Sequence, residues 1–222
     1  MKKFELTKES VEMFGRKFFR IKAFVDFGKV KAGTIGGYVE REENLSQSGD
    51  AWVSGNALVY GDAHVYGDAE VSGNAKVYGN ARVSSSALVY GNAHVYGNAE
   101  VSGNANVSGD ARVSGNARVS GSALVYGDAE VSGNAKVYGD AKLIGDAMVG
   151  SNADYICFKG FGSFNRNTTM FRTKNGSIAV SCGCFFGTLQ EFEDKVKATH
   201  GDSKFAREYL ACVSAAKIHF EV

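Results

Sequence analysis

The sequence predicts a mainly β protein: a parallel β-solenoid with a non-repeating cap at each end. Three observations support this prediction. The triplet Ala-x-Val recurs every six residues between Ala51 and Val149, seventeen times without a gap, with Leu143 once in place of Val. Gly accounts for 28 of the 222 residues and Pro for none, which favours regularly spaced turns over collagen or polyproline segments. All 15 Phe lie outside residues 51–150, so the aromatic residues that could close the ends of a solenoid are concentrated in the flanks.

Each hexad reads Val, Tyr or Ser, Gly, Asp or Asn, Ala, and one variable residue. Residues two apart share a face of a strand, so Ala and Val point inward, while the variable residue and Tyr or Ser point outward. The Gly tolerates a positive φ and makes the corner. A strand this short cannot bury its Val alone, and it must therefore stack on copies of itself as a solenoid.

Residues 1–50 break the hexad rule and are expected to form an N-terminal β cap. Two aromatic strand runs predict a hairpin that turns at Gly15-Arg16. The segment Gly33–Ser46 is expected to form an irregular first coil, because Leu45 and Val53 are eight residues apart instead of six.

Residues 151–222 are expected to form an α+β cap that covers the other end of the solenoid. Three runs read as strands: DYICFKGF, TMFRTKNG and SIAVSCGCFF. Two helices follow. Thr188 and Glu191 have the spacing of a capping box, which predicts a helix through about Ala198, and a second helix is expected from about Ser203 to His219.

The charge balance and the start of the chain indicate where the protein acts. The formal net charge is +1, so no bulk attraction to nucleic acid or to a membrane surface is expected. The first residues, MKKFELTKES, lack the apolar run of a secretory signal, and no stretch reaches the ~18 apolar residues of a membrane span. We therefore expect a cytoplasmic protein whose four Cys are reduced thiols.

The hexads resemble those of the hexapeptide-repeat proteins, whose left-handed β-helix takes three hexads per triangular coil. On this pattern the seventeen hexads make nearly six coils. The flanks, from KFELT to EENLS and from FRTKNG to AREYL, also resemble uncharacterised hexapeptide-repeat proteins of phages and prophages. The resemblance implies a phage- or prophage-encoded protein in the host cell cytoplasm, and it brings no settled activity.

Many hexapeptide-repeat proteins are acyltransferases in which a His acts as the general base. The solenoid holds His64 and His94, which are thirty residues apart. Thirty is not a multiple of eighteen, so the two lie on different faces of a three-hexad coil, as duplication of a thirty-residue block would leave them. The hexads also lack the interrupting loops that wall the substrate site of those enzymes. We expect a protein that is not an enzyme and needs no cofactor, with an acyltransferase-like enzyme as the alternative.

Two sets of side chains have the chemistry of metal ligands. The first set comprises Cys157, Cys182, Cys184, Cys212 and His200. The C-x-C spacing differs from the usual zinc motifs and would place both thiols on one side of a strand, so buried core thiols are expected and zinc is the alternative. A three-His hydratase site is not expected, because His200 and His219 both lie in the C-terminal flank.

The second set is a column of three corner carboxylates, Asp110, Asp128 and Asp146, on successive coils. Carboxylates about 5 Å apart repel one another unless solvent, salt or a cation screens them. We expect solvated carboxylates, with a weak Ca²⁺ site as the alternative.

Recognition would use the outward positions, because packing determines the inward ones. At eighteen residues per coil, Tyr60, Tyr78 and Tyr96 form one column on a single face. The cationic or titratable neighbours on that face are Lys76, His94 and Arg112. Aromatic residues interleaved with cations suit either a protein hot spot or stacked bases, and packing between the tyrosines alone is a further interpretation.

A specific partner needs a surface that does not repeat, and the caps supply one. We therefore expect binding at an edge of the C-terminal cap near Arg166, Arg172 and Lys174, together with the Tyr face. The predicted function is a rigid β-helix that docks on a protein partner, with inhibition of a host defence system as one version. A virion or assembly component is the other alternative, and nucleic acid is not expected as a partner.

Self-association is also expected, as a homodimer or homotrimer that uses an exposed Tyr/Leu stripe. Flat solenoid faces suit symmetric contacts. The C-terminal cap is expected to contribute aromatic surface from Phe161, Phe164, Phe185 and Phe186.

Overall fold

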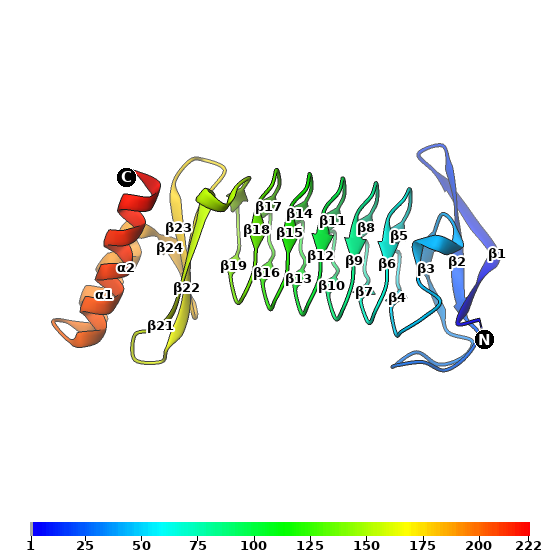
Figure 1. The fold of residues 1–222 in the computed structure, drawn as a ribbon, viewed down its shortest axis with the longest axis horizontal. Helices are drawn as coiled ribbons and strands as arrows, with labels where there is room; N and C mark the ends of the chain where they lie inside the picture. The colour runs from blue at the N-terminus through cyan, green and yellow to red at the C-terminus, as the bar shows by residue number, and fades with distance from the viewer. Residues whose placement is uncertain (1) are drawn as a thin grey trace.

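The computed structural model describes residues 2–222 as an elongated rod whose chain termini lie at opposite ends (Figure 1). Short parallel strands form the middle of the rod. A β-hairpin covers one end, and a four-stranded sheet with two helices covers the other. The predicted mainly β solenoid is therefore confirmed. Within residues 2–222, no helix combines the length and the apolar character needed to cross a membrane.

The solenoid has three faces, and each is a parallel sheet of very short strands. Strands eighteen residues apart are neighbours, so Val77 lies opposite Val59 on one side and Val95 on the other. This pairing confirms three hexads per coil.

Face 1 consists of β3 (Ile35–Val39), β5 (Leu58–Val59), β8 (Lys76–Val77), β11 (His94–Val95), β14 (Arg112–Val113), β17 (Glu130–Val131) and β20 (Met148–Val149). Face 2 consists of β4 (Trp52–Val53), β7 (Glu70–Val71), β10 (Leu88–Val89), β13 (Asn106–Val107), β16 (Leu124–Val125) and β19 (Lys142–Leu143). Face 3 consists of β6 (His64–Val65), β9 (Arg82–Val83), β12 (Glu100–Val101), β15 (Arg118–Val119) and β18 (Lys136–Val137).

The interior of the solenoid contains the Ala and Val of every hexad, all exposed by 1% or less. Neighbouring coils approach so closely that their corners need Gly. A Cβ on Gly121, where φ is +71°, would lie 2.7 Å from the backbone nitrogen of Gly139 in the next coil. Ser85, with φ at +57°, is the single hexad corner that carries a side chain.

The irregular first coil is present as predicted. Val39 lies over Val59, and Leu45 forms a bridge with Val65. Both pairs are twenty residues apart, two more than in the regular coils, which matches the eight-residue step that follows Leu45. A short 3₁₀ helix, η1 (Glu42–Asn44), lies within this coil.

The N-terminal hairpin pairs β1 (Phe4–Met13) with β2 (Arg16–Ala23). The predicted turn at Gly15-Arg16 is wrong by one residue. Met13 pairs with Arg16, so the two turn residues are Phe14 and Gly15, both with positive φ, at +54° and +69°. A two-residue loop of this kind needs left-handed backbone at both positions, and here an aromatic residue occupies the first.

Side chains of the N-terminal cap and of its irregular coil donate hydrogen bonds to the backbone of the first regular coil. The Asn44 amide, fully buried, donates to the carbonyls of Gly61 and Ala63 at 3.0 and 2.9 Å. Lys3 and Arg20 donate to three further carbonyls of the same coil.

The C-terminal sheet is antiparallel, in the order β21 (Tyr155–Phe161), β22 (Arg166–Arg172), β23 (Ile178–Cys182) and β24 (Phe185–Thr188). Three strands were expected, and there are four because a turn at Gly183 divides the third predicted run. One face of the sheet covers the end of the solenoid, where Phe171 and Ala179 join its core. The other face carries Met170 and Val180 towards the helices. The short η2 (Asn152–Asp154) precedes the sheet.

Helices α1 (Leu189–His200) and α2 (Lys204–Phe220) cover the outer face of this sheet. The predicted capping box is confirmed. The Thr188 hydroxyl accepts from the Glu191 amide at 3.2 Å, and the Glu191 carboxylate accepts from the Thr188 amide at 2.8 Å. Helix α1 continues two residues beyond the predicted Ala198, and α2 begins after the predicted Ser203, whose side chain caps it.

Candidate protein-binding surface

The three tyrosines predicted to share a column do so, and their rings stack in contact. The ring centroids of Tyr60 and Tyr78 are 4.9 Å apart with planes 6° from parallel. Those of Tyr78 and Tyr96 are 5.0 Å apart and 3° from parallel. The spacing equals the distance between coils, so the solenoid itself holds the rings in register.

The N-terminal hairpin extends this column by one ring that sequence reasoning missed. Phe14, at the hairpin turn, lies 6.5 Å from Tyr60 with its plane 21° from parallel. The Phe14 side chain is 67% exposed. Its backbone has a left-handed conformation, which is energetically unfavourable for a bulky residue. Phe18, fully buried, meets Tyr60 edge-on at 5.4 Å. The signal available in the sequence was the pair Phe14-Gly15 between two strand runs.

Cationic groups border the aromatic column. Lys76 Nζ lies 5.4 Å from the centre of the Phe14 ring, and the Arg16 guanidinium lies 5.9 Å from that of Tyr60. The imidazole of His94 meets Tyr78 edge-on at 6.2 Å. We call the four stacked rings, Phe14, Tyr60, Tyr78 and Tyr96, the aromatic column.

Tyr60 and Tyr78 in the aromatic column, and His94 beside it, have shifted pKa values. Burial, followed by the neighbouring phenol, raises the pKa of Tyr60 and of Tyr78. Burial, followed by the charges of Lys76 and Arg112, lowers the pKa of His94. At neutral pH the phenols therefore remain hydrogen-bond donors and the imidazole is neutral.

The stacking distances decide what the aromatic column can contact. Neighbouring rings cover one another's faces inside the column, so a ligand can reach ring edges, hydroxyls and the outer faces of the two end rings, Phe14 and Tyr96. Successive bases therefore have no run of free ring faces along the column. A base needs a free ring face to stack on. The geometry therefore favours a protein hot spot over stacked bases.

The structure brings one of the three predicted cap residues to face 1. Lys174 Nζ lies 3.0 Å from the Glu130 carboxylate, and the same carboxylate lies 3.9 Å from Arg112. The backbone amide of Lys174 also donates to the carbonyl of Asp146 at 3.0 Å. Lys174 thus extends the charged surface beside the column towards the C-terminal cap.

The other two cap residues lie elsewhere, and the three do not form one edge. Arg172 lies 3.6 Å from Asp154 and donates to the Phe220 carbonyl at 3.1 Å, so it holds α2 against the sheet. Arg166 lies at the opposite end of β22, about 20 Å from Arg172 along the strand, with its guanidinium over the Phe164 ring. Residues at opposite ends of one strand are too far apart to contribute to one small site.

The cysteines are not arranged as the C-x-C spacing suggested. Cys182 and Cys212 are buried, whereas Cys157 and Cys184 are exposed. Cys182 ends β23 and Cys184 lies in the turn after it, so the two thiols do not share a strand face. Burial raises the pKa of Cys212 to about 11, so its thiol stays protonated.

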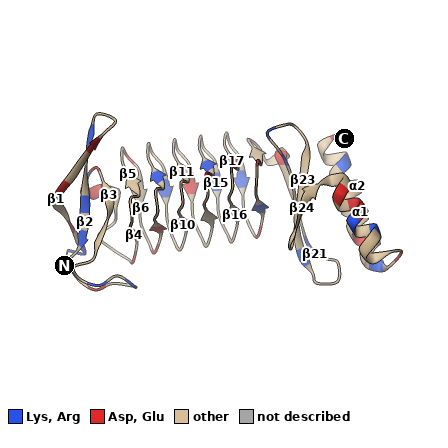
Figure 2. Cartoon of the chain, turned by 180° about the vertical axis from the view of Figure 1, so that it is seen from behind, with Lys and Arg blue, Asp and Glu red and all other residues tan. Residues whose placement is uncertain are grey.

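The column of corner carboxylates is hydrogen-bonded at its start. The Asn92 amide donates to Asp110 at 3.0 Å, which continues a ladder of corner side chains from coil to coil. Across residues 2–222, no group of three or more His, Cys, Asp or Glu side chains is placed to hold a metal ion. Positive and negative residues are mixed along the solenoid (Figure 2).

The histidine on face 3, His64, contacts both the N-terminal cap and a neighbouring ring. His64 Nδ1 lies 2.7 Å from the backbone carbonyl of Glu43. A carbonyl only accepts, so Nδ1 is the nitrogen that donates in this contact. The imidazole also stacks on Tyr66 at 5.1 Å.

The repeat region of the chain is similar to a known family of β-solenoid repeats. The family model described as the YdcK beta solenoid repeat matches residues 51–67, 75–91 and 111–127. All three segments lie within the solenoid, and the match agrees with its β-solenoid fold. No curated protein matches the chain significantly.

Proposed function

We propose that this protein is a non-enzymatic binding protein that docks on a protein partner through face 1. The observation that carries the proposal is the aromatic column, formed by Phe14, Tyr60, Tyr78 and Tyr96 and bordered by cationic side chains. Tyr and Arg are the residue types most enriched at binding hot spots. The rings are already ordered by stacking, so little side-chain entropy is lost on binding.

The chemistry of the aromatic column indicates the kind of partner. Phenol hydroxyls and ring edges offer donors and apolar contact, while Lys76 and Arg112 supply positive charge beside them. A partner surface with apolar side chains next to carboxylates complements this arrangement.

The resemblance of the flanks to phage and prophage proteins supports a more specific version. In that version the chain acts in the host cell cytoplasm and inhibits a host defence protein by covering part of its surface. The rigid solenoid presents the aromatic column without rearrangement, which suits a stoichiometric inhibitor.

The test compares the wild-type protein with the double variant Tyr78→Ser/Tyr96→Ser. Ser already occupies the next two places in this column, at Ser114 and Ser132, so the repeat accepts the change. Tyr60 is left unchanged because it packs on the buried Phe18. Capture from host lysate, followed by affinity measurement with the purified partner, is expected to show at least a tenfold loss for the variant.

The matched control is Tyr66→Ser/Tyr138→Ser, which makes the same change on face 3. It is expected to bind the partner as the wild type does. If the face 1 variant retains full affinity for a stoichiometric partner, the aromatic column is not the binding site.

A second candidate function, an acyltransferase-like enzyme, is favoured by one observation. The Glu43 carbonyl orients His64 so that its Nε2 is free to act as a general base. A shallow hollow of about 420 Å³ lies beside it, lined by Glu42, Leu45 and Gln47 among others. The test is transfer of the acetyl group from acetyl-coenzyme A. Activity that is lost in His64→Ala and kept in His94→Ala would support an acyltransferase over a binding protein.

A further inference from the structure

The outward residues on five of the six strands of face 2, from β7 to β19, read nearly the same in either direction. From β7 to β19 the variable residues are Glu70, Leu88, Asn106, Leu124 and Lys142. The second outward residues of the same coils are Ser72, Tyr90, Ser108, Tyr126 and Ile144. About β13, the middle one of these five strands, Leu88 matches Leu124 and Tyr90 matches Tyr126. The outer pairs differ: Ser72 corresponds to Ile144, and Glu70 corresponds to Lys142, which has the opposite charge.

Face 2 also carries exposed apolar surface at its centre. Leu88, Tyr90 and Leu124 are 38%, 40% and 36% exposed. Within residues 2–222, neither Glu70 nor Lys142 has an ion-pair partner, whereas other solenoid charges such as Arg118 and Glu100 are paired at 3.2 Å. Lys142 Nζ lies 5.6 Å from the centre of the Tyr126 ring, so its one charge contact on this face is with an aromatic ring. The face thus leaves an apolar stripe exposed and two opposite charges without an ion-pair partner.

We propose that face 2 binds a second copy of this chain in an antiparallel two-fold dimer. The two-fold axis lies in the plane of contact and runs along β13. Rotation by 180° about it lays Leu88 on the partner subunit's Leu124 and Tyr90 on the partner subunit's Tyr126. It also lays Glu70 on the partner subunit's Lys142, twice per dimer because the contact is isologous. Sheets packed about 10 Å apart leave room for these side chains to meet.

Charge selects this arrangement over the alternatives. A parallel dimer, with its axis along the solenoid, would bring Glu70 to the level of the partner subunit's Glu70. On face 1, the same antiparallel rotation about β11 would oppose Lys76 and the partner subunit's Arg112. On face 3, rotation about β12 would oppose Arg82 and the partner subunit's Arg118. Other axes on face 1 or face 3 would oppose a cation to Glu130 or Glu100, but both carboxylates are already paired within the chain, with Lys174 at 3.0 Å and with Arg118 at 3.2 Å. Face 2 offers unlike charges that have no ion-pair partner within residues 2–222.

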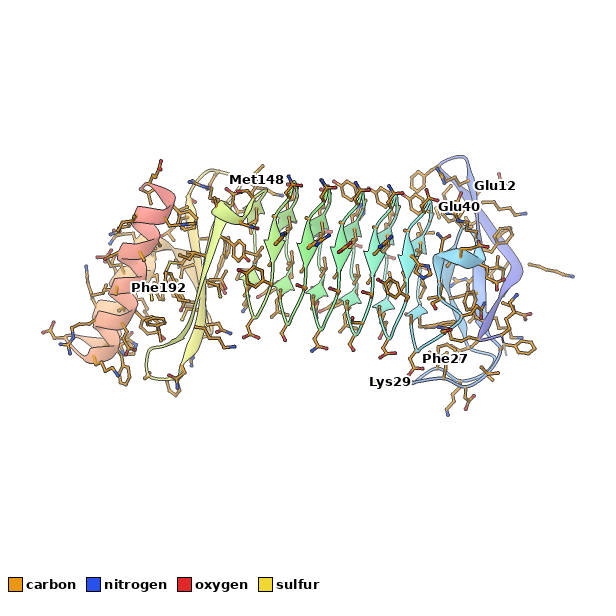
Figure 3. The ribbon with its side chains drawn as sticks, viewed as in Figure 1. Glu12, Phe27, Lys29, Glu40, Met148 and Phe192 are labelled. Carbon is orange, nitrogen blue, oxygen red and sulfur yellow. The ribbon has the colours of Figure 1, made fainter. Side chains whose placement is uncertain are left out.

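The two ends of face 2 are complementary in shape as well. At the N-terminal end, Phe27 packs edge-on over Trp52 at 5.4 Å, so the loop after β2 forms a ridge over the start of the face. At the C-terminal end, a hollow of about 320 Å³ is lined by Leu124, Lys142 and Arg166 among others. The rotation places each ridge against the partner's hollow. Figure 3 shows Phe27 and Lys29 on the side of the rod opposite Glu40 and Met148, so the ridge does not lie on face 1.

The dimer does not rest on the binding proposal for face 1, because it uses a different face. Both can operate together, since the aromatic column stays exposed when face 2 is covered. Five coils offer a contact at the low end of specific interfaces, so the dimer is expected to dissociate on dilution.

Charge exchange tests the proposal by sedimentation over a range of concentrations, against a protomer of 23.6 kDa. Glu70→Lys and Lys142→Glu, made singly, are each expected to weaken the dimer at least tenfold at low salt. Combined, they exchange the charges and are expected to restore association. The control Arg82→Glu reverses a charge on face 3 and is expected to leave the dimer unchanged.

A cross-linking experiment tests the position of the axis. In a Cys157→Ser/Cys184→Ser background, Asn106→Cys lies on the axis and is expected to cross-link to its own copy with a short bismaleimide. Arg82→Cys, at the equivalent hexad position on face 3, is expected not to. A monomer at every concentration, a trimer, a double variant no stronger than the singles, or equal cross-linking at both positions would overturn the proposal. Thermal unfolding of each variant shows whether a loss of association reflects a loss of folding.

Discussion

The two ends of the solenoid are closed by opposite chemistry. In the regular coils the backbone hydrogen bonds between coils that involve a residue outside the short strands all run one way, from an amide to a carbonyl of the following coil, as from Leu58 to Ala75 at 2.9 Å. The first regular coil is therefore left with carbonyls for the N-terminal cap to pair, and the last coil with amides for the C-terminal cap to pair. The N-terminal cap supplies donors, including the Asn44 amide and the Lys3 ammonium. The C-terminal cap supplies acceptors. Asn152 Oδ1 accepts from an amide of the last coil at 2.8 Å.

A parallel solenoid therefore has a direction, because its two ends present different backbone groups, although the sequence repeat is the same throughout. Buried backbone groups must be paired, so the cap at each end has to carry the complementary type of side chain. The two caps therefore cannot be exchanged, whatever their hydrophobic content.

The largest expected effect comes from making the same substitution at the two ends. Asn44→Asp replaces a buried donor by a carboxylate that faces the carbonyls of Gly61 and Ala63, so unfolding free energy should fall by about 3–5 kcal/mol. Asn152→Asp keeps the acceptor for the Lys136 amide and should change stability by less than about 1 kcal/mol. Urea unfolding measures both. Equal losses would contradict the proposed difference between the ends.

A smaller effect separates the middle of the solenoid from its end. Gly121 and Gly139 have nearly the same φ, at +71° and +68°, but only Gly121 has another coil against it. Gly121→Ala combines left-handed strain with a backbone clash and should cost about 3 kcal/mol, whereas Gly139→Ala should cost about 1 kcal/mol. The denaturant midpoints of the two variants measure these costs. Similar midpoints would show that the close approach of the next coil does not make the Gly121 position more sensitive to a side chain.

Next in size is the loss of the buried Lys3 ammonium. Its Nζ donates to the carbonyls of Gly49 and Ala51 at 3.1 and 2.9 Å. Lys3→Met leaves both carbonyls unpaired and should cost about 1–2 kcal/mol at pH 7. Lys2→Met, at an exposed neighbouring position, controls for the removal of a lysine.

The same variant should show a pH dependence. Burial lowers the pKa of Lys3 from 10.5 to about 8, against the opposing attraction of Asp50 and Asp68. Between pH 8 and 10.5 the unfolded chain holds a proton that the folded protein has released, so the stability of the wild type rises with pH relative to Lys3→Met. If the difference in unfolding free energy between the wild type and Lys3→Met becomes smaller from pH 8 to 10.5, the Lys3 ammonium is not desolvated in the cap.

The smallest expected effect concerns one acceptor at the C-terminal end. Thr169 Oγ1 accepts from the Lys142 amide at 3.0 Å. Thr169→Val removes the acceptor but keeps the shape, and should cost about 1 kcal/mol. Amide hydrogen exchange of Lys142 should be faster in Thr169→Val and remain slow in Thr169→Ser. Unchanged exchange in both would mean that this amide does not depend on the cap.

The solenoid was predictable because the surroundings of each hexad are other hexads. The spacing of Ala and Val identifies the inward positions, and a period of eighteen places Tyr60, Tyr78 and Tyr96 in one column without any coordinates. The candidate cap site was not predictable in the same way. Arg166, Arg172 and Lys174 are close in the sequence, but a strand separates the first from the other two.

What the sequence by itself determined is the repeating body, its coil size and its outward columns, because these depend on contacts between residues a constant distance apart in the chain. Tertiary structure alone decided where the flanks meet that body. Three contacts show this, because each joins segments of unrelated sequence. Phe14 stacks on Tyr60, Arg172 contacts α2, and Asn44 pairs with the backbone of the first regular coil. Such contacts depend on packing and on the direction of backbone hydrogen bonds at each end, and no local pattern encodes them.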